Sequence, residues 1–368
     1  MQITIVEVIS KKEIRKFHEF ARELYKTDKE FISHLDSDIE SIFTPTKNSE
    51  FKDGNAKRWL ALSNGIIVGK VAAFYNSKSH QSGIGFFDTV DNQYVANTLF
   101  DTATTWLKQN NQKVVEAPVN FGERDKYWGL MVEGFIRPSY QENYNFPYYQ
   151  KLFENYGFIK EIEQTTSEAF PDEERIQKFK KAAERLKQQE GLTVEHFTFK
   201  QMDRFIDAFT TIYNEAWKQH EHYVPLSRER VAKLFKEMKP ILREDILWFT
   251  FNYGKPVAFY LSIIDVNQIF KKLNGKMNLL GKIKFLWYRA TLKIDRIRGI
   301  IFGVVPEFQN RGLYSAMVMK MYEVVKDDKY LKSTELAWIG DFNPRMHAMF
   351  RSINAQKTKL HYTYKKDL

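Results

Sequence analysis

Apolar and polar positions divide the chain into two halves that follow the same order of elements. Residues 59–68 and 248–257 each contain an apolar run, a turn with Asn or Gly, and a second apolar run, which predicts one β-hairpin in each half. An offset of 189 positions relates these hairpins, and also the strand-like segments 3–5 and 192–194. Because several matches occur in the same order, the pattern predicts an internal duplication.

Each half ends with an Asn and a Pro that favour a helix start, an amphipathic helical pattern and a closing strand, at an offset of 197 positions. The full order of strand, helices, hairpin, strand, helix, strand, helix and strand predicts an α/β or α+β fold with helices on the faces of a sheet. Between the halves, acids after Pro171 and a glycine at position 191 predict a helix with a solvated, charged face. We therefore expect a first domain at residues 1–165, a linker helix at 166–190 and a second domain at 191–368.

The composition supports large, ordered cores. The 368 residues suffice for two domains, and 43% of them are hydrophobic and 15% aromatic. The absence of cysteine excludes disulfides, thiolate metal ligands and a cysteine nucleophile, and it fits a reducing compartment. The first residues lack the basic and apolar regions of an export signal, and no apolar run reaches the roughly 18 residues that cross a bilayer. These features predict a cytoplasmic protein.

The segment Gly303–Leu313, with the sequence Gly-Val-Val-Pro-Glu-Phe-Gln-Asn-Arg-Gly-Leu, carries the strongest chemical signal. The apolar run 300–305 predicts a buried strand that Pro306 ends, and the apolar spacing from Leu313 onward predicts a helix. Backbone N–H groups and the positive end of the helix dipole converge at the turn between them. Such a turn suits a phosphate or a pyrophosphate.

The strand, Pro306, Gln309 and Gly312 resemble the coenzyme A loop of the GNAT (N-acetyltransferase) superfamily, and the duplicated chain is similar to a tandem GNAT protein. The resemblance implies two tandem GNAT-like domains, each a mixed, mostly antiparallel sheet flanked by helices. It also implies acetyl-CoA or another acyl-CoA as co-substrate and an amine as acceptor. In the first half, residues 86–94 hold the equivalent position with no glycine and two acids, so we expect the first domain to be a degenerate copy.

The resemblance assigns cofactor roles to the loop and to the strand before it. Main-chain groups of Val304 and Val305 would run along the pantetheine arm, and one of their N–H groups would stabilise the oxyanion of acyl transfer. The remaining cofactor-binding residues that it implies are Gln309, Asn310, Arg311, Gly312, Leu313, Tyr314, Ser315 and Asn343. Two positions depart from the family pattern. Tyr314 stands where Gly or Ala is usual, and Phe350 stands where members often carry the Tyr that protonates the departing thiolate.

The sequence leaves the proton acceptor for the amine open. His220 lies in a loop where family members place acceptor-binding residues, and Glu335 lies on a strand whose end would line a cleft. The His-Glu-His run at 220–222 also suggests a metal, but adjacent side chains point apart and no further ligands are evident, so we expect no metal site. Tyr362 and Tyr364 each carry a hydroxyl of the type that Phe350 lacks. Alternation along the strand, however, puts both on one face and favours a core role for them.

Basic residues outnumber acidic ones, which gives a formal net charge of +10. This charge attracts polyanions, but many proteins carry it for solubility, so it gives no strong nucleic-acid signal. Residues 266–295 combine basic side chains with aromatic and apolar ones, which fits contact with a membrane surface, an anionic substrate or, as we favour, the neighbouring domain. The sequence indicates no particular oligomeric state.

The leading hypothesis is an acyl-CoA-dependent N-acyltransferase, with acetyl-CoA as the favoured donor and one working site in the second half. The second hypothesis is a non-catalytic protein that binds coenzyme A or a partner through a decayed site, which Tyr314 and Phe350 favour. The third is a tandem GNAT-like transferase that uses aminoacyl-tRNA, although such proteins do not need the loop from Gln309 to Gly312.

Overall fold

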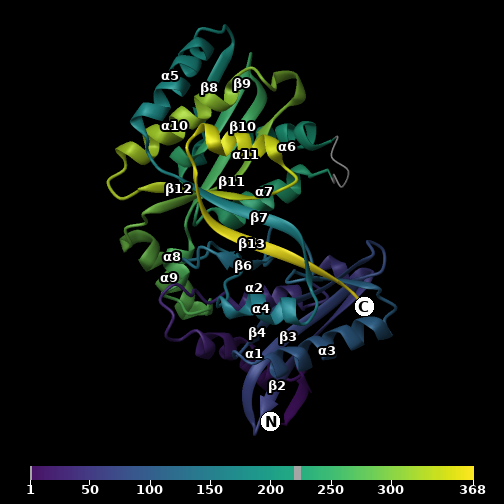
Figure 1. The fold of residues 1–368 in the computed structure, drawn as a ribbon. Helices are drawn as coiled ribbons and strands as arrows, with labels where there is room; N and C mark the ends of the chain where they lie inside the picture. Colours follow the sequence, from purple (N-terminus) through teal and green to yellow (C-terminus); the bar gives the residue numbers. More distant parts are fainter. Residues whose placement is uncertain (1, 219–224) are drawn as a thin grey trace.

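The computed structural model describes residues 2–218 and 225–368 (Figure 1). The strands in this part of the chain are β1 (Ile3–Glu7), β2 (Gly54–Ser63), β3 (Ile66–Asn76), β4 (Gln81–Thr89), β5 (Val114–Ala117), β6 (Leu130–Glu133), β7 (Ile159–Ala169), β8 (Leu192–His196), β9 (Leu247–Asn252), β10 (Lys255–Ile264), β11 (Arg296–Val304), β12 (Ser333–Gly340) and β13 (Gln356–Asp367). The helices are α1 (Lys11–Leu24), α2 (Asp36–Ile42), α3 (Gln93–Gln109), α4 (Tyr148–Asn155), α5 (Glu173–Lys187), α6 (Met202–Trp217), α7 (Arg228–Met238), α8 (Asn267–Phe270), α9 (Leu279–Thr291), α10 (Leu313–Asp327) and α11 (Pro344–Ser352). The strands form one sheet in the order β1-β2-β3-β4-β5-β13-β7-β12-β11-β10-β9-β8, and β6 pairs with β13 off this path.

The predicted duplication is visible in the strand registers. Glu7 of β1 pairs with Trp59 of β2, and His196 of β8 pairs with Trp248 of β9, so the offset seen in the sequence also relates paired residues. Both predicted hairpins form, as β2–β3 and β9–β10, and each turn contains a glycine with a positive φ.

The last strand of each half lies in the sheet of the other half. β7, the final strand of the first half, pairs antiparallel with β12 of the second, while β13 pairs antiparallel with β5 and β6 of the first. β7 and β13 also pair with each other, so they run side by side between the two halves (Figure 1). The expected α/β fold with tandem, mixed, mostly antiparallel sheets and flanking helices is confirmed, but this exchange joins the two sheets into one.

Helices cover both faces of the second-half sheet. α6 lies on one face, where the rings of Phe209 and Phe259 stack with centroids 4.8 Å apart. Because successive strand residues point to opposite faces, Tyr260 faces α10 on the other side, and it lines a cavity there together with Val318. α5, which forms where a helix between the halves was predicted, packs against α10.

Candidate functional site

β11 and β12 separate along their length and leave a cleft between them. The two strands pair in parallel only from Arg296 to Gly299 on β11, and the rest of β11 pairs with β10. The cleft has a volume of about 770 Å³, and its walls come from β11, β12, α10 and α11. The walls are mostly apolar, with contributions from Trp217, Phe302, Phe308, Met317, Ile339 and Met349.

One end of the cleft reaches the turn between β11 and α10. Asn310 and Gly312 take left-handed backbone conformations there, with φ of 62° and 81°. α10 begins at Leu313, and no side chain of the described residues caps its first turn. The N–H groups of Leu313 and Tyr314 therefore remain available to an anion at the cleft, whose wall these residues form in part together with Gly312.

Hydrogen bonds hold Gln309 and Asn310 beside the cleft. The Gln309 amide donates to the Val304 carbonyl at 3.4 Å. Arg345, in the first turn of α11, donates to the side-chain oxygens of Gln309 at 3.3 Å and Asn310 at 3.4 Å. Arg345 thus places a positive charge beside the turn. The sequence reasoning missed this residue, although its position directly after Pro344 was a usable signal.

Most of the predicted cofactor-binding residues line the cleft. Those that do so are Val304, Gln309, Asn310, Gly312, Leu313, Tyr314 and Asn343. Arg311 lies over the ring of Phe308, 4.8 Å from its centroid, and the N–H of Ser315 donates to the Gly312 carbonyl at 2.8 Å. The N–H of Val305 was one of the two groups expected to stabilise the oxyanion. It donates instead to the Val257 carbonyl on β10 at 3.0 Å, so it does not face the cleft.

The two departures from the family pattern both lie in the cleft wall. The Tyr314 ring centroid is 5.7 Å from that of Phe302 and 5.8 Å from that of Phe179. The Tyr314 hydroxyl donates to the Met349 carbonyl at 3.4 Å, so the ring is packed between β11, α5 and α11. Phe350 is buried on α11 and also faces the cleft. Its phenyl ring offers no proton for a departing thiolate.

A different tyrosine, Tyr260 of β10, lines the cleft where the strands separate. A Cβ placed on Gly299, the last residue of β11 that pairs with β12, would lie 2.8 Å from the Tyr260 hydroxyl. Burial raises the pKa of Tyr260 to about 12, so the hydroxyl stays protonated at neutral pH.

The two tyrosines that the sequence analysis considered lie away from the cleft, in the core of the first half. Tyr364 is buried there, and its hydroxyl donates to Glu154 at 3.1 Å. Tyr362 packs against the same core.

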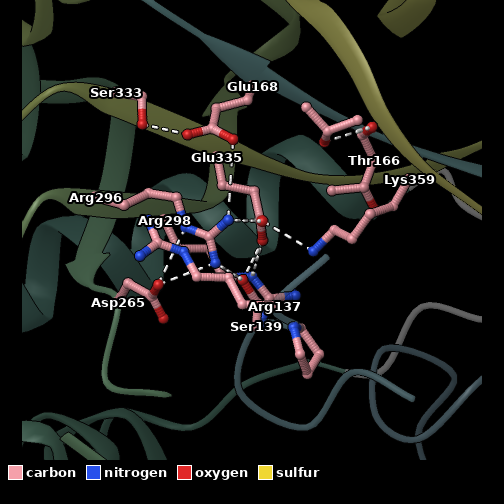
Figure 2. A network of polar contacts seen from close by, with 12 residues as sticks. Arg137, Ser139, Thr166, Glu168, Asp265, Arg296, Arg298, Ser333, Glu335 and Lys359 are labelled. Atoms are coloured by element: carbon pink, nitrogen blue, oxygen red, sulfur yellow. Dashed lines mark hydrogen bonds and ion pairs between the residues drawn. The ribbon is translucent and has the colours of Figure 1, made fainter. Parts of the chain in front are cut away.

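Glu335 lies in a buried network of ion pairs that joins the two halves (Figure 2). Its Oε2 atom is 2.8 Å from Arg296 Nη1 and 2.9 Å from Lys359 Nζ, and its side chain is 1% exposed. Burial alone would raise the pKa of Glu335, but the charges of Lys359 and Arg296 lower it below its usual value. A doubly paired carboxylate has little affinity for a proton, so this arrangement favours a structural role for Glu335.

His220, the other candidate base, lies outside the described residues. In the part of the chain that the structure does describe, no group of three or more His, Asp or Glu side chains could hold a metal ion. Within the same residues, every helix is too short or too polar to cross a bilayer.

The equivalent groove in the first half is closed. The N–H of Val119, just after β5, donates to the Ile84 carbonyl of β4 at 2.9 Å. A Cβ on Gly85 would lie only 1.9 Å from the Val119 carbonyl oxygen, so the two chain segments leave no space between them. The Asn92 side chain also caps α3, because it accepts hydrogen bonds from the N–H groups of Tyr94 and Val95. An anion at this helix start would need the same N–H groups. These contacts leave an extended ligand no room between β4 and the segment after β5.

Comparison with solved structures gives the same architecture. The chain matches the tandem GNAT protein from the clavulanic acid biosynthesis pathway with a TM-score of 0.58 and 8% identity, over 100% of this chain and 98% of that chain. It also matches a GCN5-related glucosamine N-acetyltransferase region of a fungal multi-domain GH3 β-N-acetylglucosaminidase, with a TM-score of 0.55 and 9% identity, over 99% of this chain and 38% of that chain. The protein therefore has the fold of a tandem GNAT protein.

Relatives similar in sequence match along nearly their whole length. Protein YghO of Escherichia coli (strain K12) is 22% identical over 372 residues, which cover 98% of this chain and 94% of YghO. Bacterial ceramide synthase of Caulobacter vibrioides (strain NA1000 / CB15N) is 23% identical over 379 residues, which cover 100% of this chain and 98% of that protein. No family model matches the chain.

Proposed function

We propose that the protein is an acyl-CoA-dependent N-acyltransferase whose one working site is the cleft between β11 and β12. The observation that carries the proposal is the separation of these strands beyond Gly299, in a cleft that ends at the uncapped N-terminus of α10. An extended pantetheine arm would pair with the open edge of β11, and the N–H groups of α10 would bind the pyrophosphate. Arg345 adds positive charge at that end.

We further propose that the donor is a fatty acyl-CoA and the acceptor an amino lipid. The cleft adjoins a second apolar cavity beside α5 and α10, and the two share Tyr260, Val318, Leu336 and Ile353. The second cavity has a volume of about 70 Å³ and lies directly against the cleft, which supports a path for an acyl chain past the thioester toward α5. Ceramides are N-acylated long-chain amino alcohols, and the similarity to bacterial ceramide synthase covers 100% of this chain and 98% of that protein. Acetyl-CoA, the donor that the sequence favoured, is the competing choice.

The backbone of β11 supplies groups for both the cofactor and the oxyanion. Because Val305 donates to β10 and N–H groups alternate along an antiparallel strand, the N–H groups of Val304 and Phe302 point away from β10 into the cleft. We assign the Val304 N–H to the pantetheine arm. Phe302 lies nearer to Gly299, so its N–H is the better placed oxyanion donor.

The chemistry then proceeds in two steps. The amine nitrogen attacks the thioester carbonyl carbon and forms a tetrahedral oxyanion, while the extra proton on nitrogen passes to water. The intermediate re-forms its carbonyl and breaks the C–S bond, and the departing thiolate takes the proton of the Tyr260 hydroxyl. Water returns a proton to the phenolate, which restores Tyr260. The products are an amide and free coenzyme A.

Titration calorimetry with palmitoyl-CoA and acetyl-CoA tests the cofactor site, and mass spectrometry of mixtures with a long-chain amino alcohol or a short amine tests transfer. We expect saturable binding and formation of an N-acyl amide from the long-chain pair. Failure to bind either thioester would remove the proposed site. Binding without transfer to any amine would favour the non-catalytic alternative, which the missing hydroxyl at Phe350 supports.

Replacing the Tyr260 hydroxyl tests its assigned role as proton donor. Tyr260→Phe is expected to lower kcat by about 100-fold, the size typical of a lost general acid, and to leave the Kd for acyl-CoA unchanged because the ring remains. Steady-state kinetics and calorimetry measure the two quantities. The matched control is Tyr253→Phe, at a residue that is 69% exposed in a hairpin turn. An unchanged kcat would exclude Tyr260 from the reaction.

Enlarging a side chain at the boundary of the two cavities tests the path of the acyl chain. Val318 of α10 lines both cavities, so Val318→Phe is expected to obstruct a long chain while sparing an acetyl group. We expect the ratio of kcat/KM for acetyl-CoA over palmitoyl-CoA to rise by about 10-fold or more, and Val318→Ala to leave it near the wild-type value. An equal loss with both donors would show that the chain does not pass Val318.

A further inference from the structure

Residues 266–278 anchor the start of α9 on the first half. The N–H of Asp36 donates to the Gly275 carbonyl at 2.8 Å, and the Asn267 side chain donates to the Pro138 carbonyl at 2.8 Å. The sequence favoured packing of residues 266–295 against the neighbouring domain. Residues 266–278 do pack in this way. α9 itself is different, because only one of its faces is buried.

The outer face of α9 is a row of exposed apolar side chains, which we call the apolar stripe. Its members are between 58% and 76% exposed: Leu279, Leu280, Ile283, Leu286 and Trp287. At about 3.6 residues per turn, these positions share one side of the helix, opposite the buried Gly281 and Phe285. Single exposed apolar residues are ordinary, but a contiguous row of them marks a contact surface.

Basic residues flank the apolar stripe, and no acidic residue interrupts it. Between Asp265 and Asp295 the chain contains no acid and seven basic residues, namely Lys271, Lys272, Lys276, Lys282, Lys284, Arg289 and Lys293. The helical spacing puts the exposed Lys282 along one border of the stripe and the exposed Lys284 along the other. Long basic side chains in such positions pack their stems on apolar surface and extend their charges toward lipid phosphates.

We propose that α9 docks the protein on an anionic lipid membrane. The apolar stripe enters the boundary between head groups and acyl chains, and the flanking basic side chains bind lipid phosphates. A second copy of the chain is a less suitable occupant, because symmetric contact would bring basic residues of both copies together. The docking does not depend on the proposed catalytic function, although it would bring such an enzyme to amphiphilic substrates.

Vesicle co-sedimentation of the full-length protein tests the docking. We expect binding to vesicles of phosphatidylglycerol and phosphatidylcholine, weakening as salt rises, and little binding to phosphatidylcholine alone. Each lysine near an anionic surface contributes about fivefold in affinity, so Lys282→Gln with Lys284→Gln should weaken binding at least about tenfold. Ile283→Ser with Trp287→Ser should do the same by removing apolar contact. Ile66→Ser with Tyr253→Ser is the matched control, at residues 70% and 69% exposed elsewhere on the surface.

Fluorescence gives a second readout that does not depend on stability. Vesicles with brominated acyl chains should quench the wild-type tryptophan emission, and Trp287→Phe should lose most of that quenching while keeping vesicle affinity. The docking is wrong if the wild type sediments with neither vesicle or if the stripe variants bind like the control. It is also wrong if ultracentrifugation shows a dimer that Ile283→Ser with Trp287→Ser makes monomeric.

Discussion

Gly312→Glu is expected to weaken acyl-CoA binding by at least about 100-fold, which corresponds to about 2.7 kcal/mol. Gly312 has a φ of 81°, a conformation that costs other residues about 1–2 kcal/mol. The added carboxylate would also lie beside the N–H groups that we assign to the pyrophosphate, where like charges repel. Steric damage to the fold is small, since the nearest atom to the new Cβ is Leu186 Cδ1 at 3.8 Å.

The matched control for this variant is Gly65→Glu. Gly65 has a similar φ of 79° in the hairpin turn of the first half, and no atom of the described residues lies within 4 Å of its added Cβ. Calorimetric titration with acyl-CoA measures binding, and thermal denaturation measures stability. We expect both variants to lose similar stability and only Gly312→Glu to lose affinity. Equal affinities of the two variants would place the cofactor elsewhere.

Arg296→Met is expected to destabilise the protein by about 3–5 kcal/mol, because it leaves buried carboxylates without their partner. Arg296 is 1% exposed, and its guanidinium lies 2.9 Å from Asp265 and 2.8 Å from Glu335 (Figure 2). The same network reaches Lys359 on β13 and Ser139 of the first half. The loss therefore weakens the junction created by the exchanged strands as well as the second half.

Chemical denaturation followed by circular dichroism measures this loss. Arg228→Ala is the control, since Arg228 pairs with Asp203 and Asp207 while remaining 46% exposed, and such surface pairs contribute about 0–1 kcal/mol. A change below about 1 kcal/mol for Arg296→Met would show that the network does not stabilise the junction.

The repeated hairpins were predictable because their signals are local. Strand alternation, a turn residue and a fixed offset suffice to locate β2–β3 and β9–β10. The exchange of β7 and β13 was not predictable in this way. The period of a strand shows which side chains share a face, but it does not show which strand lies beside it.

In the candidate site, too, only the residues with a local sequence signal were predictable. The turn from Gln309 to Gly312 is a continuous segment whose residue types specify its shape, so its place at the cleft was predictable. Tyr260 joins the cleft only because β10 pairs with β11. Glu335 was a candidate base by its position near a strand end, but Lys359, from the last strand of the chain, engages its carboxylate. Such long-range partners leave no local pattern in the sequence.

A crystal structure with a non-hydrolysable thioether analogue of palmitoyl-CoA tests the central claim most directly. We predict the pyrophosphate on the first N–H groups of α10, the pantetheine arm along Val304 in the cleft between β11 and β12, and the sulfur beside the Tyr260 hydroxyl. Coenzyme A density in the first half, or anywhere outside that cleft, would contradict the proposed site.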